Sequence, residues 1–194
     1  MIGGKEVSAE SMPSDNQSLD RLIGIAKKNG ATDAKVIKPG AVAVRDWVRL
    51  KCLYGCPNYG SCLTCPPYSP TPEETRRILN EYDTAMLVRF GGTPSDGEKS
   101  VREYGRPIGT LMVKIEREVF LEGYPAAFAY SAGHCQLCEE GCSLKQCRHP
   151  AQARPSMEGC GIDVFTTIRN AGFEIRVAKS RNESPAFYGL LLVK

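Results

Sequence analysis

The sequence predicts one layered domain of the α/β or α+β class, with helices packed on a mixed sheet of about five strands. Stretches with helical spacing alternate along the chain with short apolar runs. A chain of 194 residues fits a single domain and can bury roughly 70% of its unfolded surface. We place this domain at residues 18–194, after a flexible N-terminus at residues 1–17. Eight of the nine cysteines lie in two loops at the ends of predicted strands.

The first predicted helix begins after Ser18, which is a suitable N-cap, and ends at Gly30. Its apolar residues recur at helical spacing: Leu19, Leu22, Ile23 and Ala26. Residues 33–37 and 41–44 are apolar runs on either side of a Pro-Gly pair, which suits a turn. We therefore expect two extended segments that lead into the first group of cysteines.

The next predicted helix begins at a capping box, in which Thr71 is the N-cap, Pro72 occupies the first helical position and Glu74 returns to the cap. Residues 84–90 form a short apolar run typical of a buried strand. A double glycine follows this run, so we expect the strand to end there, with a loop over residues 91–97.

The second half of the chain repeats this alternation. A longer helix is predicted from Pro107 to Gly123, and a strand over residues 126–132 leads into the second group of cysteines. After that group, a short helix is predicted between an N-cap at Asp163 and a stop at Gly172. Two final strands are expected at residues 174–178 and 188–194, and their closeness in sequence suits an antiparallel pairing.

Charge and composition exclude several classes of protein. The net charge is +3 and basic residues are interleaved with acidic ones, so nucleic-acid binding is not expected. No stretch approaches the ~18 apolar residues of a membrane span, and the first residues lack the apolar run of a secretory signal. We therefore expect a cytoplasmic protein that binds no membrane.

The cysteines form the strongest functional pattern. The first cysteine segment (residues 52–65) reads C-x3-C-x5-C-x2-C, and the second (residues 135–147) reads C-x2-C-x3-C-x4-C. Cytosolic thiols are kept reduced, which favours metal ligands over disulfides. Four thiolates satisfy either a tetrahedral zinc ion or a 4Fe-4S cluster. The predicted metal ligands are Cys52, Cys56, Cys62, Cys65, Cys135, Cys138, Cys142 and Cys147.

The spacing favours two 4Fe-4S clusters, one in each segment. Zinc sites usually combine two CxxC pairs separated by a longer element, whereas here each group of four is compact and neither contains two such pairs. Zinc nevertheless remains the alternative. A mixed site, in which Cys62 and Cys65 meet Cys135 and Cys138, also remains open.

Two longer stretches carry a family resemblance. "GCPNYGSCLTCPPYSPTPEE" and "SAGHCQLCEEGCSLKQCRHPAQARPSMEGCGIDV" resemble the two signature segments of the DUF2284 family, which is described as predicted metal-binding proteins of bacteria and archaea. The resemblance covers most of the chain after residue 40, with both motifs in the expected order. It implies metal binding by the cysteines, and it carries over no reaction and no choice of metal.

The remaining candidates are weaker. His134 and His149 lie beside the second segment, but eight cysteines already fill two sites, so we expect both histidines to face solvent or to support ligands. Cys160 precedes a helix and is a nucleophile or reserve ligand in one interpretation, and a buried structural thiol in the other. Three basic residues are expected to balance charge at the second segment or simply to face solvent: Lys145, Arg148 and Arg154.

No Ser-His-Asp arrangement, HExxH motif or nucleotide fingerprint is present, so no catalysis by side chains is predicted. Our leading hypothesis is a protein that carries two 4Fe-4S clusters and transfers electrons to a redox partner protein or a small redox substrate. One alternative is a zinc-stabilised interaction module. The other is an iron-sulfur enzyme that uses a site near Cys160.

Overall fold

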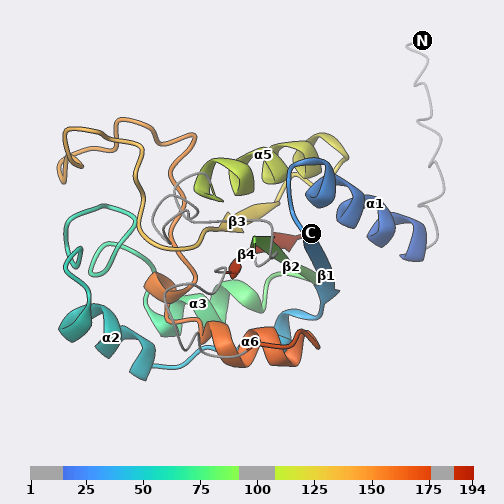
Figure 1. Ribbon diagram of the computed structural model, residues 1–194, viewed down its shortest axis with the longest axis horizontal. Helices are drawn as coiled ribbons and strands as arrows, with labels where there is room; N and C mark the ends of the chain where they lie inside the picture. The colour runs from blue at the N-terminus through green and yellow to red at the C-terminus, as the bar shows by residue number, and fades with distance from the viewer. Residues whose placement is uncertain (1–14, 92–107, 176–185) are drawn as a thin grey trace, which may run out of the picture.

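The computed structural model describes residues 15–91, 108–175 and 186–194 (Figure 1). A sheet of four strands lies at its centre in the order β1-β2-β4-β3, and every pairing is antiparallel. The strands are β1 (Asp33–Ile37), β2 (Thr84–Gly91), β3 (Phe128–Tyr130) and β4 (Ala186–Val193). The fold is therefore α+β. Among the described residues the sheet has four strands and is antiparallel, where about five and a mixed arrangement were expected.

The central pair of strands is the longest. β2 pairs with β4 from Thr84 opposite Val193 to Gly91 opposite Ala186. Both strands are almost continuously buried because helices cover both faces of the sheet. Gly189 in β4 allows this close covering: a Cβ at this position would lie 2.5 Å from Sδ of Met112, so the Met112 side chain would have to move.

Two helices, α1 (Asp15–Lys28) and α5 (Ile108–Leu121), cover one face of the sheet (Figure 1). Their apolar side chains pack against those of β2 and β4 in one hydrophobic core. The fully buried members contributed by α5 recur at helical spacing, which explains why its sequence predicted a helix: Ile108, Met112, Ile115 and Val119.

The opposite face is covered by α3 (Pro72–Leu79), α6 (Val164–Asn170) and the short 3-10 helix η3 (Glu158–Cys160) (Figure 1). The predicted capping box of α3 is present, since the Thr71 hydroxyl accepts from the Glu74 amide and the Glu74 carboxylate accepts from the Thr71 amide. Asp163 caps α6 as predicted, by accepting from the Thr166 amide. Local signals therefore placed these two helices correctly.

Other predictions were displaced or fall outside the described residues. α1 begins at Asp15, three residues before the expected cap at Ser18. Residues 41–44 do not form a strand: Pro39–Ala41 is a 3-10 helix (η1), and Val44 makes only an isolated bridge with Ile162. Three other predictions lie mostly outside the described residues. They are the flexible N-terminus (residues 1–14 of it), the loop after β2 (residues 92–97 of it) and the strand at 174–178 (residues 176–178 of it).

A helix that the sequence did not predict leads into the cysteines. α2 (Trp47–Gly55) buries only Val48, and no side chain caps its first turn. Its remaining apolar residues are exposed, so the pattern lacked the core-facing stripe by which helices are recognised. Cys52 therefore lies on a helix and not at the end of a strand. In the ranges that the structure describes, no helix is long and apolar enough to cross a membrane.

Candidate metal centre

The two cysteine segments lie at the same end of the molecule, although more than sixty residues separate them (Figure 1). The Cys62 thiol donates to the carbonyl oxygen of Cys135 at 3.7 Å. Nearby, Nδ2 of Asn58 lies 3.4 Å from Nδ1 of His134. The fold therefore brings together the two loops that the sequence singled out.

The first segment is folded by its own backbone. The amide of Cys65 donates to the carbonyl of Cys62 at 2.9 Å, and the amide of Ser69 donates to that of Cys65 at 3.1 Å. The amide of Gly60, a residue with φ of +70°, donates to the carbonyl of Pro66 at 2.9 Å. These successive turns hold Cys62 and Cys65 in a compact loop between α2 and α3.

Side chains then fasten this loop to η3. Nη1 of Arg49 donates to the carbonyl oxygens of Pro70 and Gly159, at 3.0 and 2.9 Å. The Ser69 hydroxyl donates to the same Gly159 carbonyl at 2.6 Å. Both donors lie in or next to the first segment, so these hydrogen bonds fix the first segment against η3.

The thiols of the first segment affect one another electrostatically. Burial is the main cause that raises the pKa of Cys65 to about 12, and the neighbouring charges of Cys62, Cys56 and Cys52 raise it further. Burial also raises the pKa of Cys52, while the Arg49 guanidinium acts in the opposite direction. Burial therefore favours the protonated form of Cys52 and Cys65 in the absence of a metal.

The second segment begins five residues after β3, and the stretches of chain on either side of it are bonded to each other. The Ser131 amide donates to the carbonyl of Pro155 at 2.8 Å, and the Met157 amide donates to the carbonyl of Ser131 at 3.0 Å. Its four cysteines are all half-buried. Burial is the first cause that raises the pKa of Cys135, and the charges of Cys62, Cys138 and Cys142 add to it.

Cys62 lies between the two groups of thiols. Burial raises its pKa, and among its neighbours both Cys142 and Cys65 interact with it. Cys147 is not among the thiols that act most strongly on Cys62 or Cys135. The eight thiols therefore do not form two groups isolated from each other, and the contact across segments is made by Cys62.

The donor chemistry fits a metal centre, although the cysteine side chains are not gathered around one common point in this arrangement. All nine cysteines are free thiols, so no disulfide competes for the predicted ligands. Within the described residues, no three His, Cys, Asp or Glu side chains are close enough together to hold a metal ion. Metal binding would therefore require the thiols to close in from these positions.

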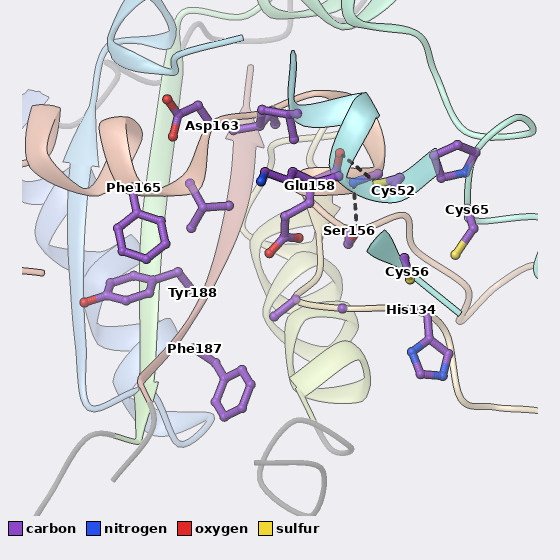
Figure 2. Close-up of a pocket in the computed structure, with 18 of the residues that line it drawn as sticks. Cys52, Cys56, Cys65, His134, Ser156, Glu158, Asp163, Phe165, Phe187 and Tyr188 are labelled. Atoms are coloured by element: carbon purple, nitrogen blue, oxygen red, sulfur yellow. Dashed lines mark hydrogen bonds between the residues drawn. The ribbon is translucent and has the colours of Figure 1, made fainter. Parts of the chain in front are cut away.

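A cavity of about 810 Å³, which sequence analysis did not place, borders the first segment (Figure 2). One side of it, the thiol wall, contains Cys52, Cys56 and Cys65, and the opposite side, the aromatic wall, contains Phe165, Phe187 and Tyr188. Glu158 of η3 lies between the two walls, and its side chain is exposed to the cavity. Desolvation by the surrounding protein raises the pKa of the Glu158 carboxyl, and hydrogen bonding from its own amide, Ser156 and Gly133 opposes the rise.

Cys160 is fully buried in the core of the second face, and its carbonyl accepts from the Thr75 hydroxyl at 2.8 Å. Burial raises the pKa of its thiol to about 12. Both features disfavour the reactive thiolate that one interpretation of the sequence required. Its neighbours Glu158 and Gly159 line the cavity.

The other candidates around the second segment have different environments. His149, Lys145 and Arg148 are exposed, in agreement with a solvated face. Arg154 instead forms a mostly buried ion pair with Glu116 of α5, in which its Nε donates to Oε2 at 2.7 Å. Glu116 lies 38 positions before Arg154 in the sequence, so the residues around Arg154 could not predict this ion pair.

Comparison with protein-family models supplies the classification. Residues 35–193 match the model of DUF2284, described as a predicted metal-binding protein. The chain belongs to this family. The match includes both cysteine segments and all four strands except the first two residues of β1. Searches against curated proteins and solved structures give no match.

Proposed function

We propose that this DUF2284 protein binds two 4Fe-4S clusters through the cysteines of its two segments and transfers single electrons to a redox partner protein or a small redox substrate. The observation that carries the proposal is the convergence of two groups of free thiols at one end of a core that is complete without them. A core of this size needs no metal for stability, so the thiols are available for a functional centre.

The ligands in this proposal are the eight cysteines of residues 52–65 and 135–147. When bound, an iron-sulfur cluster supplies a site that accepts and releases one electron at a time. Burial favours the protonated form of Cys52, Cys62, Cys65 and Cys135, so binding releases protons and strengthens as the pH rises.

The chain's own residues would position and balance such a centre. Arg49 brings a positive charge close to Cys52 while its hydrogen bonds hold the loop on η3. Because Cys62 interacts with thiols of both segments, a centre in one segment would lie close to a centre in the other. Short separation favours electron transfer between two centres.

A zinc-stabilised interaction module is the second candidate, and the surface of α2 favours it. Four apolar side chains are exposed on this helix, beside the first segment: Trp47, Leu50, Leu53 and Tyr54. Isolated apolar residues on a surface are ordinary, but a group of this size is typical of an interaction site. Zinc would then serve to fix the neighbouring loop.

Anaerobic purification followed by iron, sulfide and zinc analysis and EPR spectroscopy separates the two candidates. We expect iron and sulfide in equal amounts. The reduced protein should give an EPR signal, and this signal should be weaker in a Cys65→Ser variant. Cys160→Ser is the matched control, because that thiol is buried in the core and is not a proposed ligand. A colourless protein with stoichiometric zinc and no iron would rule out the iron-sulfur proposal.

A further inference from the structure

The cavity beside the first segment has the size and shape of a small-molecule site. Its volume of about 810 Å³ falls within the range of roughly 300–1,000 Å³ found for ligand pockets. It is lined by residues from α2, the first segment, η3, α6 and β4, so elements from distant parts of the chain enclose it. Such sites are typically apolar with a few polar groups that orient the ligand.

The aromatic wall supplies the apolar part of the cavity. Phe187 and Tyr188 come from β4, and Phe165 comes from the first turn of α6. Figure 2 shows the three rings on the side of the cavity that faces away from the cysteines. Tyr188 is held in place by an edge contact with Phe173, with ring centroids 5.8 Å apart. Rings arranged in this way can contact an apolar body and a cation.

Glu158 supplies the orienting charge. Its side chain points into the space between the aromatic wall and the thiol wall (Figure 2). None of the ion pairs found among the described residues includes this carboxylate. Asp163 also lines the cavity, but its two oxygens already accept from the amide and hydroxyl of Thr166. Neither carboxylate has a cationic partner among the ion pairs of the described residues, and Glu158 is the one whose side chain points between the two walls.

The lysine in the lining is not paired with this carboxylate. Lys51 of α2 borders the cavity, but it is exposed, and no ion pair joins it to Glu158 in the described part of the chain. The thiol wall contributes acidic groups only, and a thiolate-bound metal centre there would retain nearby negative charge. The interior of the cavity is thus complementary to a positively charged group.

We propose that this cavity binds a small organic amine, with its protonated nitrogen beside Glu158 and its apolar body against the aromatic wall. The ligand would then lie next to Cys52, Cys56 and Cys65. This inference goes beyond metal binding and electron transfer, and it is independent of whether the thiols hold iron or zinc.

Three probes of nearly equal size and different charge test the proposal. The protein, with its metal as isolated, is titrated by calorimetry with phenethylamine, phenethyl alcohol and hydrocinnamate. A charge-assisted hydrogen bond in a partly enclosed site is expected to give the amine an affinity about tenfold above that of the alcohol. Hydrocinnamate should bind more weakly than either, because its carboxylate would lie beside Glu158.

Glu158→Gln removes the charge while preserving the size of the side chain, so phenethylamine should lose its advantage over phenethyl alcohol. The matched control is Glu73→Gln, an exposed carboxylate of α3 outside the cavity lining, which should leave all three affinities unchanged. Phe165→Ala should weaken the amine and the alcohol by the same factor, since it shortens the aromatic wall without altering charge.

Metal content and circular dichroism of each variant show whether its fold and its centre are retained. The proposal is overturned if phenethylamine does not bind the native protein, if Glu158→Gln preserves the preference for the amine, or if hydrocinnamate binds best. If Glu158→Gln does not fold, the order of the three affinities in the native protein and in Phe165→Ala decides the question.

Discussion

The two cysteine segments differ in how strongly the rest of the protein holds them. The first begins on α2, is folded by successive turns and is fastened to η3 by Arg49 and Ser69. The second lies within residues 131–157, which the structure describes throughout. This stretch contains neither a helix nor a strand, and its backbone hydrogen bonds lie mainly near its two ends. A site built from both therefore combines a preformed half with a half that depends on its contacts or its metal for order.

Metal removal should expose this difference most strongly. Under anaerobic chelation, hydrogen exchange should accelerate more than about tenfold across residues 135–147, because few backbone bonds oppose local opening there. The amides of Cys65 and Ser69 should retain most of their protection, since their acceptors belong to the same loop. Amides shared by β2 and β4 serve as the internal reference. Equal acceleration in the two segments would show that the first is not preformed.

Glu116→Ala should cost more stability than the other polar substitutions considered below. Glu116 accepts from Nε of Arg154 and from the amide of Ala129, both at 2.7 Å. It thereby fixes the chain that follows the second segment to α5 and β3. Both side chains of the ion pair are only 13% exposed, so removing the carboxylate leaves a mostly buried charge and should lower the free energy of unfolding by about 3 kcal/mol.

Urea denaturation measures this loss, and Glu118→Ala on the same helix is its matched control. Glu118 pairs with Lys28, whose side chain is 72% exposed, so its removal should have a much smaller effect. Similar losses in the two variants would mean that the buried pair contributes no more than an exposed one.

Arg49→Met should weaken the first segment without altering the second. The substitution preserves much of the apolar stem but removes donors to the carbonyls of Pro70 and Gly159, so we expect a loss of about 2 kcal/mol. Exchange of amides in residues 62–69 should accelerate in this variant. Arg45→Met, an exposed position on the approach to α2, is the control, and a comparable effect there would argue against the specific role of Arg49.

Thr71→Ala tests the exit of the first segment. Loss of the N-cap of α3 should lower the free energy of unfolding by about 1 kcal/mol, again measured in urea. Thr71→Ser should recover most of the loss, because serine retains the accepting oxygen. If serine and alanine have the same effect, the cap contributes little.

The smallest expected effect is the pH dependence of the same capping box. Hydrogen bonds from the amide and hydroxyl of Thr71 lower the pKa of the Glu74 carboxyl in the folded protein. Its stabilisation is therefore fully present above the unfolded pKa, near 4.5, and is lost as the pH falls through the lower folded value. The difference in unfolding free energy between the native protein and Glu74→Gln should shrink over that acidic range, and a constant difference would contradict the mechanism.

Local chemistry explains which parts of the fold could be predicted. The capping box at Thr71, the N-cap at Asp163 and the helical spacing of α5 act within a few residues, so the sequence displays them directly. α2 was missed because its packing relies on Arg49 and η3 instead of an apolar stripe. Residues 41–44 have strand-like composition but are used as core-filling side chains beside α6.

The same distinction applies to the site. Spacing was sufficient to identify two clustered groups of thiols and to suggest metal binding. It left open a mixed site in which Cys62 and Cys65 meet Cys135 and Cys138, and only the fold shows that Cys62 contacts Cys135, because that contact joins positions 73 residues apart. The cavity could not be predicted from the sequence either. Its thiol wall and its aromatic wall come from parts of the chain that are about one hundred residues apart and meet only after folding.

The position of β4 in the sheet has a consequence for biosynthesis. This strand is the last described element in the chain, yet it lies inside the sheet and pairs with both β2 and β3. During translation, both cysteine segments emerge from the ribosome before the strand that completes their scaffold. The nascent chain therefore presents unprotected thiols to the cell until translation reaches β4, and any loading of a metal at a finished site would have to wait for that strand.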